Sequence, residues 1–117
     1  MKARSLSRIE FLQGTLDVLI LRTLLGEPKH GHAIAKHIQQ TSEHLLQVET
    51  GSLYPALHRL EAKGLIAASW ELSDKGKRAR YYRLTPLGHK ELAAGRSKWE
   101  TFARAMGLVL RPAEREG

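Results

Sequence analysis

Residues 51–66, with the sequence GSLYPALHRLEAKGLI, constrain the fold of this chain more than any other stretch. Apolar side chains recur there at the spacing that places them on one buried face of a helix, namely Leu53, Leu57 and Leu60. Pro55 suits the first turn of a helix, where its missing N–H needs no partner. Gly64 suits the left-handed position that ends a helix. The sequence therefore predicts a short helix that is closed by Gly64 and followed at once by a strand.

The side of this predicted helix that faces away from the leucines carries small, aromatic and cationic groups. Its members are Ser52, Tyr54, Pro55, His58, Arg59 and Lys63. A helix with leucines inward and such groups outward fits the major groove of DNA. An ordinary amphipathic helix with a solvated outer face has the same pattern, and Tyr54, at the flank of the leucine face, also suits a core position. The helix alone therefore leaves both interpretations open.

A basic hairpin follows the helix. Residues 66–72 and 78–84 have the composition of strands, and Asp74 and Gly76 supply turn chemistry within residues 73–77. Its cationic residues are Lys75, Lys77, Arg78, Arg80 and Arg83. A helix followed by a basic hairpin is the winged helix-turn-helix pattern, in which the helix enters the major groove and the wing meets the backbone or minor groove. Solvated turns are often cationic too, but this density beside such a helix favours DNA binding.

The length and charge of the chain agree with this interpretation. A chain of 117 residues suits one small domain, and a net charge of +7 favours a polyanionic partner. Membrane surfaces are polyanionic too, but no stretch approaches the roughly 18 consecutive apolar residues of a spanning helix. The basic first residues are not followed by the apolar core of a signal peptide. Without cysteine the chain forms neither disulfides nor thiolate zinc sites. We therefore expect a cytoplasmic protein.

Catalytic, metal and cofactor sites are not predicted. The chain has six histidines, but their spacing does not place two on one helical face as a metal would need. The glycines lie at the ends of predicted elements and match no phosphate-binding loop. No Ser/His/Asp order or carboxylate pair has a convincing context. We therefore expect that the chain is not an enzyme.

The predicted fold is one α+β domain, a winged helix-turn-helix with a two-stranded basic wing and a long C-terminal helix. Its parts are a flexible basic arm (1–8), the winged helix-turn-helix (9–84), the long helix (85–111) and a tail (112–117).

Local signals set the expected limits of the remaining elements. Thr15 is expected to cap a first helix that runs to about residue 25. A second helix is expected over residues 31–40, with Ile34, Ala35 and Ile38 as its buried positions. Residues 41–49 form a loop or a short strand. The long helix is expected to be capped by Thr85, with Pro86 at its first position.

The long helix carries an apolar stripe. Residues recur along it at alternating spacings of four and three, and those predicted to make an interface are Leu92, Trp99, Phe102, Ala103, Met106 and Leu110. A helix at the end of a small domain has little of its own core left to cover so wide a face. The stripe therefore predicts a partner helix, most simply the same helix of a second copy. The alternative is that it docks back onto the first helix of its own chain.

Four motifs that occur in order resemble those of the PadR-type bacterial transcriptional regulators. They occupy residues 11–21, 30–36, 51–61 and 80–88, and the resemblance extends over roughly positions 9–110. The length is similar to that of the short subgroup, which ends in a single C-terminal helix. His32 is a departure, because the family more usually carries Tyr there; both are flat side chains with a polar tip.

This resemblance implies a homodimer held by the C-terminal helix. Two-fold symmetry would then present two recognition helices to a palindromic operator about one helical turn apart. The resemblance also implies a repressor, since the residues themselves indicate DNA binding but not its sign. In multidrug-responsive members, a Trp at the place of Trp99 stacks flat aromatic ligands between subunits. Such a planar aromatic effector could therefore release the DNA here, unless Trp99 only fills the dimer core.

The function predicted from the sequence is thus that of a homodimeric DNA-binding transcriptional regulator. Its DNA contacts are expected from Ser52, Tyr54, Pro55, His58, Arg59, Lys63, Lys75, Lys77, Arg78 and Arg80. The main alternative is a winged helix that binds another protein and never touches DNA. A small-molecule sensor with DNA binding as its output is compatible with the first interpretation.

Overall fold

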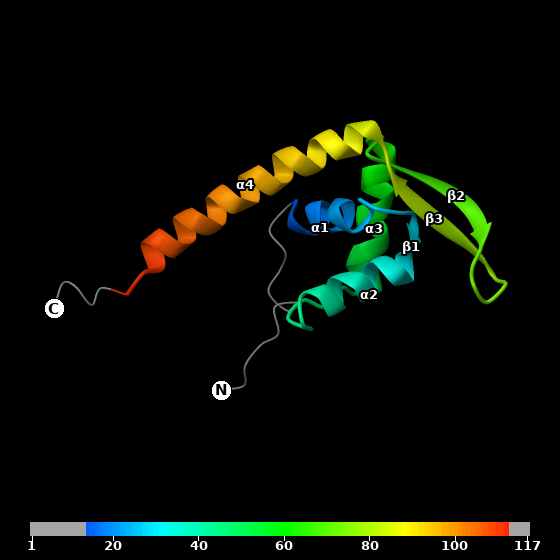
Figure 1. Ribbon diagram of the computed structural model, residues 1–117, viewed down its shortest axis with the longest axis horizontal. Helices are drawn as coiled ribbons and strands as arrows, with labels where there is room; N and C mark the ends of the chain where they lie inside the picture. Colours follow the sequence, from blue (N-terminus) through cyan, green and yellow to red (C-terminus); the bar gives the residue numbers. More distant parts are fainter. Residues whose placement is uncertain (1–13, 113–117) are drawn as a thin grey trace.

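The computed structural model describes residues 14–112. Within this range lie the helices α1 (Thr15–Thr23), α2 (Gly31–Thr41), α3 (Thr50–Ala62) and α4 (Pro86–Leu110) and the strands β1 (Lys29–His30), β2 (Ile66–Leu72) and β3 (Arg78–Leu84). Figure 1 shows a body of α1, α2 and α3 from which the β2–β3 hairpin and α4 project in opposite directions. This is the expected α+β winged helix-turn-helix with a long C-terminal helix. The predicted arm (1–8), the motif residues 11–13 and the tail beyond Pro112 lie outside the described residues.

The core lies where α1, α2 and α3 meet the base of the hairpin. Its fully buried side chains are Ile20, Leu21, Ile34, Leu53, Leu57, Leu60 and Ile66. The three leucines predicted to form the inner face of α3 are each at most 1% exposed, so that prediction is confirmed. Ile34 and Ile38 are buried on α2 as expected, whereas Ala35 is only partly buried.

The end of α3 agrees with the prediction, whereas the position of Pro55 in the helix does not. The helix begins at Thr50, so Pro55 is its sixth residue and lies in the second turn, not in the first turn where we expected it. The helix therefore continues past a residue that removes one of its hydrogen bonds, because burial of the leucine face outweighs that local cost. The other end matches the expectation. Gly64 is left-handed at φ 76°, and the N–H groups of Gly64 and Leu65 donate to the carbonyls of Glu61 and Leu60 at 3.0 Å.

Two helix caps differ from what the sequence indicated. Thr15 does not cap α1; the cap position belongs to Gly14, which is left-handed at φ 91° and suits a glycine for that reason. The helix also ends at Thr23, before the predicted limit. The cap of α2 is His30, whose Nδ1 accepts a hydrogen bond from the Ala33 N–H at 3.1 Å. Histidine is not among the usual capping residues, which explains why the sequence did not reveal it.

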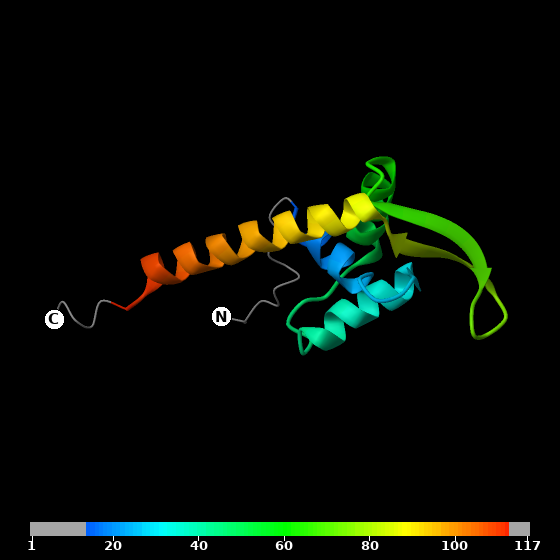
Figure 2. The same ribbon diagram turned by 45° about the horizontal axis from the view of Figure 1, so that its top comes forward.

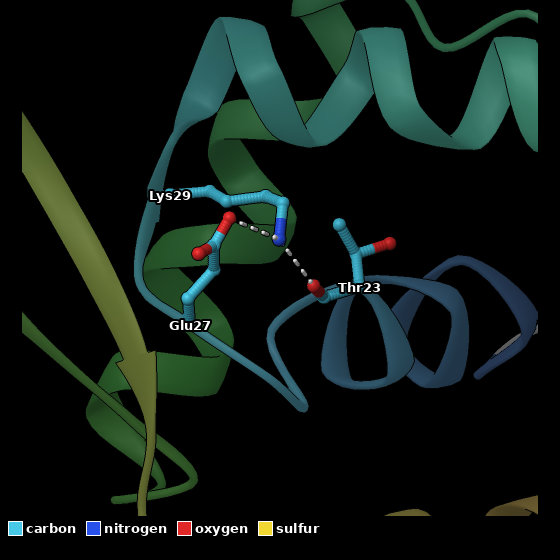
Figure 3. A network of polar contacts seen from close by, with 3 residues as sticks. All are labelled: Thr23, Glu27 and Lys29. Atoms are coloured by element: carbon cyan, nitrogen blue, oxygen red, sulfur yellow. Dashed lines mark hydrogen bonds and ion pairs between the residues drawn. The ribbon is translucent and has the colours of Figure 1, made fainter.

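The sheet has a third strand that the sequence did not predict. Strand β1 pairs antiparallel with β3, giving the order β1-β3-β2. In Figure 3, the Lys29 ammonium donates to the Thr23 carbonyl at 3.2 Å and pairs with Glu27 at 3.8 Å. These contacts hold β1 against the end of α1. A strand of two residues is too short to have a pattern of its own, which is why it was missed.

For the segment between α2 and α3 the sequence predicts a loop or a short strand. The structure has a loop there. It contains two consecutive left-handed residues, Glu43 at φ 55° and His44 at φ 65°. Side chains with a Cβ seldom adopt this conformation, so the loop turns sharply at some cost in backbone energy. The turn lies at the start of the loop that connects α2 to α3.

The long helix α4 is attached to the body at its start. As predicted, Thr85 caps it, accepting from the Gly88 N–H at 3.0 Å, and Pro86 lies in its first turn. The first half of α4 packs on α1, and Leu92 is only 7% exposed there. The prediction that Leu92 belongs to an interface with a second copy is therefore wrong, because its surface is already buried within its own chain. Figures 1 and 2 both show the second half extending beyond the body.

Candidate nucleic-acid interface

The exposed ridge of α3 is formed by residues opposite its buried leucines. Helical periodicity places Gly51, Pro55, His58 and Ala62 on this ridge, and all four are exposed. Gly51 has no side chain and that of Pro55 is compact, so side chains project little from the first half of the ridge. His58 is the group that protrudes from its middle. This ridge has the shape and the free polar group that a recognition helix presents to base edges.

Arg59 lies beside this ridge and is held by a carboxylate of another helix. Its guanidinium Nη2 donates to Oδ1 of Asp17 on α1 at 2.7 Å. The Arg59 side chain is 51% exposed and that of Asp17 only 17%. One donor of the guanidinium is thus engaged, and the others face solvent. Arg59 can therefore reach a DNA duplex on this flank while α1 fixes its direction.

The remaining predicted residues of α3 lie on its two flanks. Tyr54 is 40% exposed, and it leans on the start of α2 so closely that a Cβ at Gly31 would lie 2.7 Å from its hydroxyl oxygen. Its ring thus packs partly against the body, the second role that the sequence allowed. Ser52 and Lys63 are exposed on the opposite flank, where they line a groove between α1, α3 and α4.

The wing carries two kinds of cation. Lys75 and Lys77 are exposed at the turn, where their backbone N–H groups lie 3.3 Å from the Ser73 hydroxyl oxygen. Within residues 14–112 neither lysine side chain has an ion-pair partner. Such ammonium groups on a projecting turn are free to meet phosphates.

Two of the three arginines of the wing, Arg78 and Arg80, have partners among the described residues. The Arg78 guanidinium lies over the ring of Trp70, 5.2 Å from its centroid. Arg80 Nη2 donates to Oε2 of Glu61, in the last turn of α3, at 2.7 Å. The Arg80 Nε is buried without a hydrogen-bond partner among the described residues. Arg80 therefore joins the wing to α3, a structural role that the sequence did not predict.

Tyr82 lies on the same face of β3 as Arg80, two residues further along the strand. It is 3% exposed, and burial raises the pKa of its phenol above the ordinary value of 10, against the opposing effect of the Arg80 guanidinium. The phenol is therefore neutral at physiological pH, and the charge at this point of the wing is set by the Arg80–Glu61 pair.

The second half of α4 exposes large apolar side chains. Trp99 and Phe102 lie with their ring centroids 5.9 Å apart. Trp99, Phe102 and Met106 are each between 42% and 46% exposed, and Leu110 is 68% exposed. Ala103 is exposed as well. The part of the chain that the structure describes leaves these side chains substantially exposed. Trp99 and Phe102 also line the groove that reaches Arg59.

Neither a metal site nor a membrane-spanning helix is found in the described range. No three histidine or acidic side chains among residues 14–112 gather as a metal ion would require. His30 and His32 stack with centroids 6.3 Å apart, and His30 meets the edge of Tyr81 at 5.3 Å, so both are packing groups here. No helix within residues 14–112 is long and apolar enough to cross a bilayer.

A helix-turn-helix with an exposed recognition ridge and a cationic wing defines a DNA-binding regulator of the winged-helix class. Residues 20–94 match the model of the family described as "Transcriptional regulator PadR-like family". The chain therefore belongs to the PadR-like family of transcriptional regulators, which are not enzymes.

Relatives and solved structures agree with this assignment. The chain is 37% identical over 95 residues to "Transcriptional regulator Rv3488" of Mycobacterium tuberculosis, covering 81% of this chain and 85% of the relative. A transcriptional regulator from Clostridium thermocellum has a similar structure, with a TM-score of 0.77 and 29% identity over 85% of this chain and 96% of that one. A PadR family regulator from Eggerthella lenta gives a TM-score of 0.69 and 33% identity, covering 85% and 84% of the two chains.

Proposed function

We propose that this protein is a homodimeric repressor that binds a palindromic operator in the cytoplasm. The observation that supports DNA contact most directly is the exposed ridge of α3 beside free lysines on the wing. In this proposal His58, Arg59 and Tyr54 read base edges, Ser52, Pro55 and Lys63 lie along the duplex, and the wing cations neutralise phosphates. Repression rests on the resemblance to the family.

The apolar second half of α4 supports the dimer. Trp99, Phe102, Ala103, Met106 and Leu110 lie along it and remain exposed in the described part of the chain. An apolar patch of this size on a projecting helix is typical of an interface. Pairing with the same helix of a second copy would bury it and place two copies of α3 about a two-fold axis.

The first test is the salt dependence of DNA binding. The promoter region beside the protein's own gene would be searched for an inverted repeat, and binding to it and to an unrelated duplex measured by fluorescence anisotropy. Lys77→Ala and Lys75→Ala should weaken binding to both duplexes. Each should lower the slope of log affinity against log salt by about 0.9, because one phosphate contact is lost. Unchanged slopes would favour the alternative in which this winged helix binds a protein.

A second test separates base reading from positioning. His58→Ala should reduce affinity for the inverted repeat by about tenfold, as expected for a base contact of roughly 1–3 kcal/mol, while leaving the unrelated duplex nearly unaffected. An equal loss on both duplexes would assign His58 to the backbone. Arg59→Ala gives the same comparison on the flank, with Asp17→Asn as the control that leaves the guanidinium in place.

We further propose that a planar aromatic molecule binds at Trp99 and releases the DNA. The adjacent rings of Trp99 and Phe102 support this, because two offset rings on one helix face can hold a flat ligand by stacking and, for a cation, by attraction to the ring faces. Titration of planar dyes into a Trp70→Phe variant would follow Trp99 fluorescence alone. Saturable quenching coupled to DNA release would support the effector. A Trp99 that no planar compound quenches would be a core residue of the dimer.

A further inference from the structure

One face of the wing changes from buried to exposed along its length. Residues directly opposite in an antiparallel pair point to the same side of the ribbon. The register pairs Ala68 with Tyr82, Trp70 with Arg80 and Leu72 with Arg78. Tyr82 is buried near the body, whereas Trp70 is 58% and Leu72 69% exposed further out. The outer part of this face is therefore a patch of Trp70, Leu72, Arg78 and Arg80, which we call the Trp70 face.

The ion pair between Arg80 and Glu61 shows how the Trp70 face is oriented relative to α3. Glu61 lies in the last turn of α3, and Arg80 reaches it at 2.7 Å. The Trp70 face is therefore turned toward the C-terminal end of α3 and not away from it. Figure 1 shows the hairpin projecting past that helix, so its outer half extends beyond the body. Trp70 therefore lies on the side of the wing from which Arg80 reaches α3.

The chemistry of the Trp70 face combines a flat apolar ring with cations. The Arg78 guanidinium lies 5.2 Å from the centroid of the Trp70 ring. This contact orients both groups, and it leaves the guanidinium donors free for an anion. A ring that packs on an apolar ligand while its cation binds a charge beside it matches the sugar and phosphate of one nucleotide. The net charge of +7 and the free lysines at the wing turn favour the same partner over a protein surface.

We propose that Trp70 packs on deoxyribose of the DNA strand that passes between α3 and the wing, with Arg78 on the adjoining phosphate. This inference rests on the proposed function. When α3 lies in the major groove and the wing turn reaches the neighbouring minor groove, the backbone that separates the two grooves runs past the face of the wing turned toward α3. Trp70 is then a non-ionic anchor for the backbone, and it fixes the wing on DNA of any sequence.

The experiment follows Trp70 directly in the unmodified sequence. The chain contains two tryptophans, so protein labelled with 5-fluorotryptophan gives two fluorine resonances, and Trp70→Phe identifies that of Trp70 by removing it. Addition of a duplex of unrelated sequence, and then of the inverted repeat, should shift the Trp70 resonance in both cases. Fluorescence anisotropy of the same duplexes measures binding independently.

Variants separate the two parts of the contact. Trp70→Ala should lower affinity about fivefold to tenfold for both duplexes, because a large apolar contact is lost, and should leave the salt slope unchanged. Arg78→Ala should lower the slope by about 0.9. Trp70→Phe keeps a flat ring and should recover most of the affinity. Leu87→Ala, which truncates a comparably exposed leucine outside the wing, is the matched control and should change neither quantity. Thermal unfolding checks that each variant is folded.

The outcomes distinguish this inference from the proposed function. A wild-type protein that binds neither duplex overturns both. Binding by anisotropy with an unmoved Trp70 resonance overturns the Trp70 contact alone and assigns the face to a protein partner. A Trp70→Ala variant that loses affinity only for the inverted repeat also overturns it, because such a loss would show base reading. Equal losses with an unchanged salt slope support it.

Discussion

The two halves of α4 have similar apolar patterns and different surroundings. The first half lies on the body, where Leu92 is 7% exposed, whereas the second half exposes Trp99, Phe102 and Met106 by more than 40% each. Two glycines lie where the first half meets the body. A Cβ at Gly88 would lie 2.1 Å from the Leu65 carbonyl oxygen, and one at Gly95 would lie 3.0 Å from a methyl carbon of Val18. Small residues therefore mark where the helix docks on its own chain.

An apolar stripe does not by itself show what covers it. The stripe of α4 continues through both halves, so hydrophobic periodicity treats them alike. Contact with the body requires close approach of the backbones at Gly88 and Gly95, whereas nothing lies within 4 Å of a Cβ at Gly107 in the second half. Large side chains that stay more than two-fifths exposed in the described part of the chain follow where that contact ends.

A charge in the second half of α4 should have the largest effect. If the proposed homodimer forms there, Met106→Glu places an unpaired carboxylate in its interface from each copy. The dimer dissociation constant should rise about a thousandfold, which corresponds to about 4 kcal/mol. Sedimentation equilibrium measures it, and affinity for the inverted repeat should fall with dimerisation. A dimer of unchanged stability would show that the interface lies elsewhere. The monomer should remain folded in either case.

A methyl group in the first half tests the role of the glycines. Gly88→Ala should lower the free energy of unfolding by about 3 kcal/mol, because its Cβ would overlap the backbone carbonyl of Leu65. Gly107→Ala is the matched control in the second half, since nothing lies within 4 Å of a Cβ there. It should be neutral or stabilise the helix by up to about 1 kcal/mol. Chemical denaturation of both variants makes the comparison, and similar losses would contradict the assignment of docking to the first half alone.

The ends of α4 should differ by a smaller amount. The Thr85 hydroxyl accepts from the Gly88 N–H at 3.0 Å and lies within donating distance of the carbonyls of Gly64, at 2.7 Å, and Leu65, at 3.0 Å. Thr85→Ala should therefore cost about 1 kcal/mol. Arg111→Ala, at the free end, should stay within about 0.5 kcal/mol of the parent. Thermal unfolding of the two variants at one protein concentration measures the difference, and an equal effect would mean that Thr85 does not anchor the helix.

Much of the fold could be predicted because its signals are local. The leucine spacing of α3, the turn residues of the hairpin and the Thr85–Pro86 start of α4 each act within a few residues. The errors arose where tertiary contacts prevailed over local rules. Burial of its leucine face extends α3 past Pro55, and pairing with β3 creates a strand of two residues at Lys29.

The candidate site could be predicted as a set of residues but not as a set of contacts. Clusters of cations are visible in the sequence, whereas their partners are not. Arg59 binds Asp17 from 42 positions away, and Arg80 binds Glu61 from 19 positions away. No periodicity connects such residues, because the fold alone brings them together. The pairs distinguish Arg59 and Arg80, which are fixed by carboxylates, from Lys75 and Lys77, which have no ion-pair partner within residues 14–112.

The start of α3 has a consequence for amide exchange. Its cap position, Glu49, makes no side-chain hydrogen bond to the helix, Gly51 follows in the first turn, and Pro55 gives no N–H to the carbonyl of Gly51. The first turns of the helix thus have little stability of their own, whereas the later turns are secured by Leu57, Leu60 and the Gly64 stop. Local opening at residues 50–52, before the buried Leu53, therefore requires less free energy than unfolding of the whole domain. The rate of amide hydrogen exchange at this end of the helix should therefore fall when a DNA duplex binds to it.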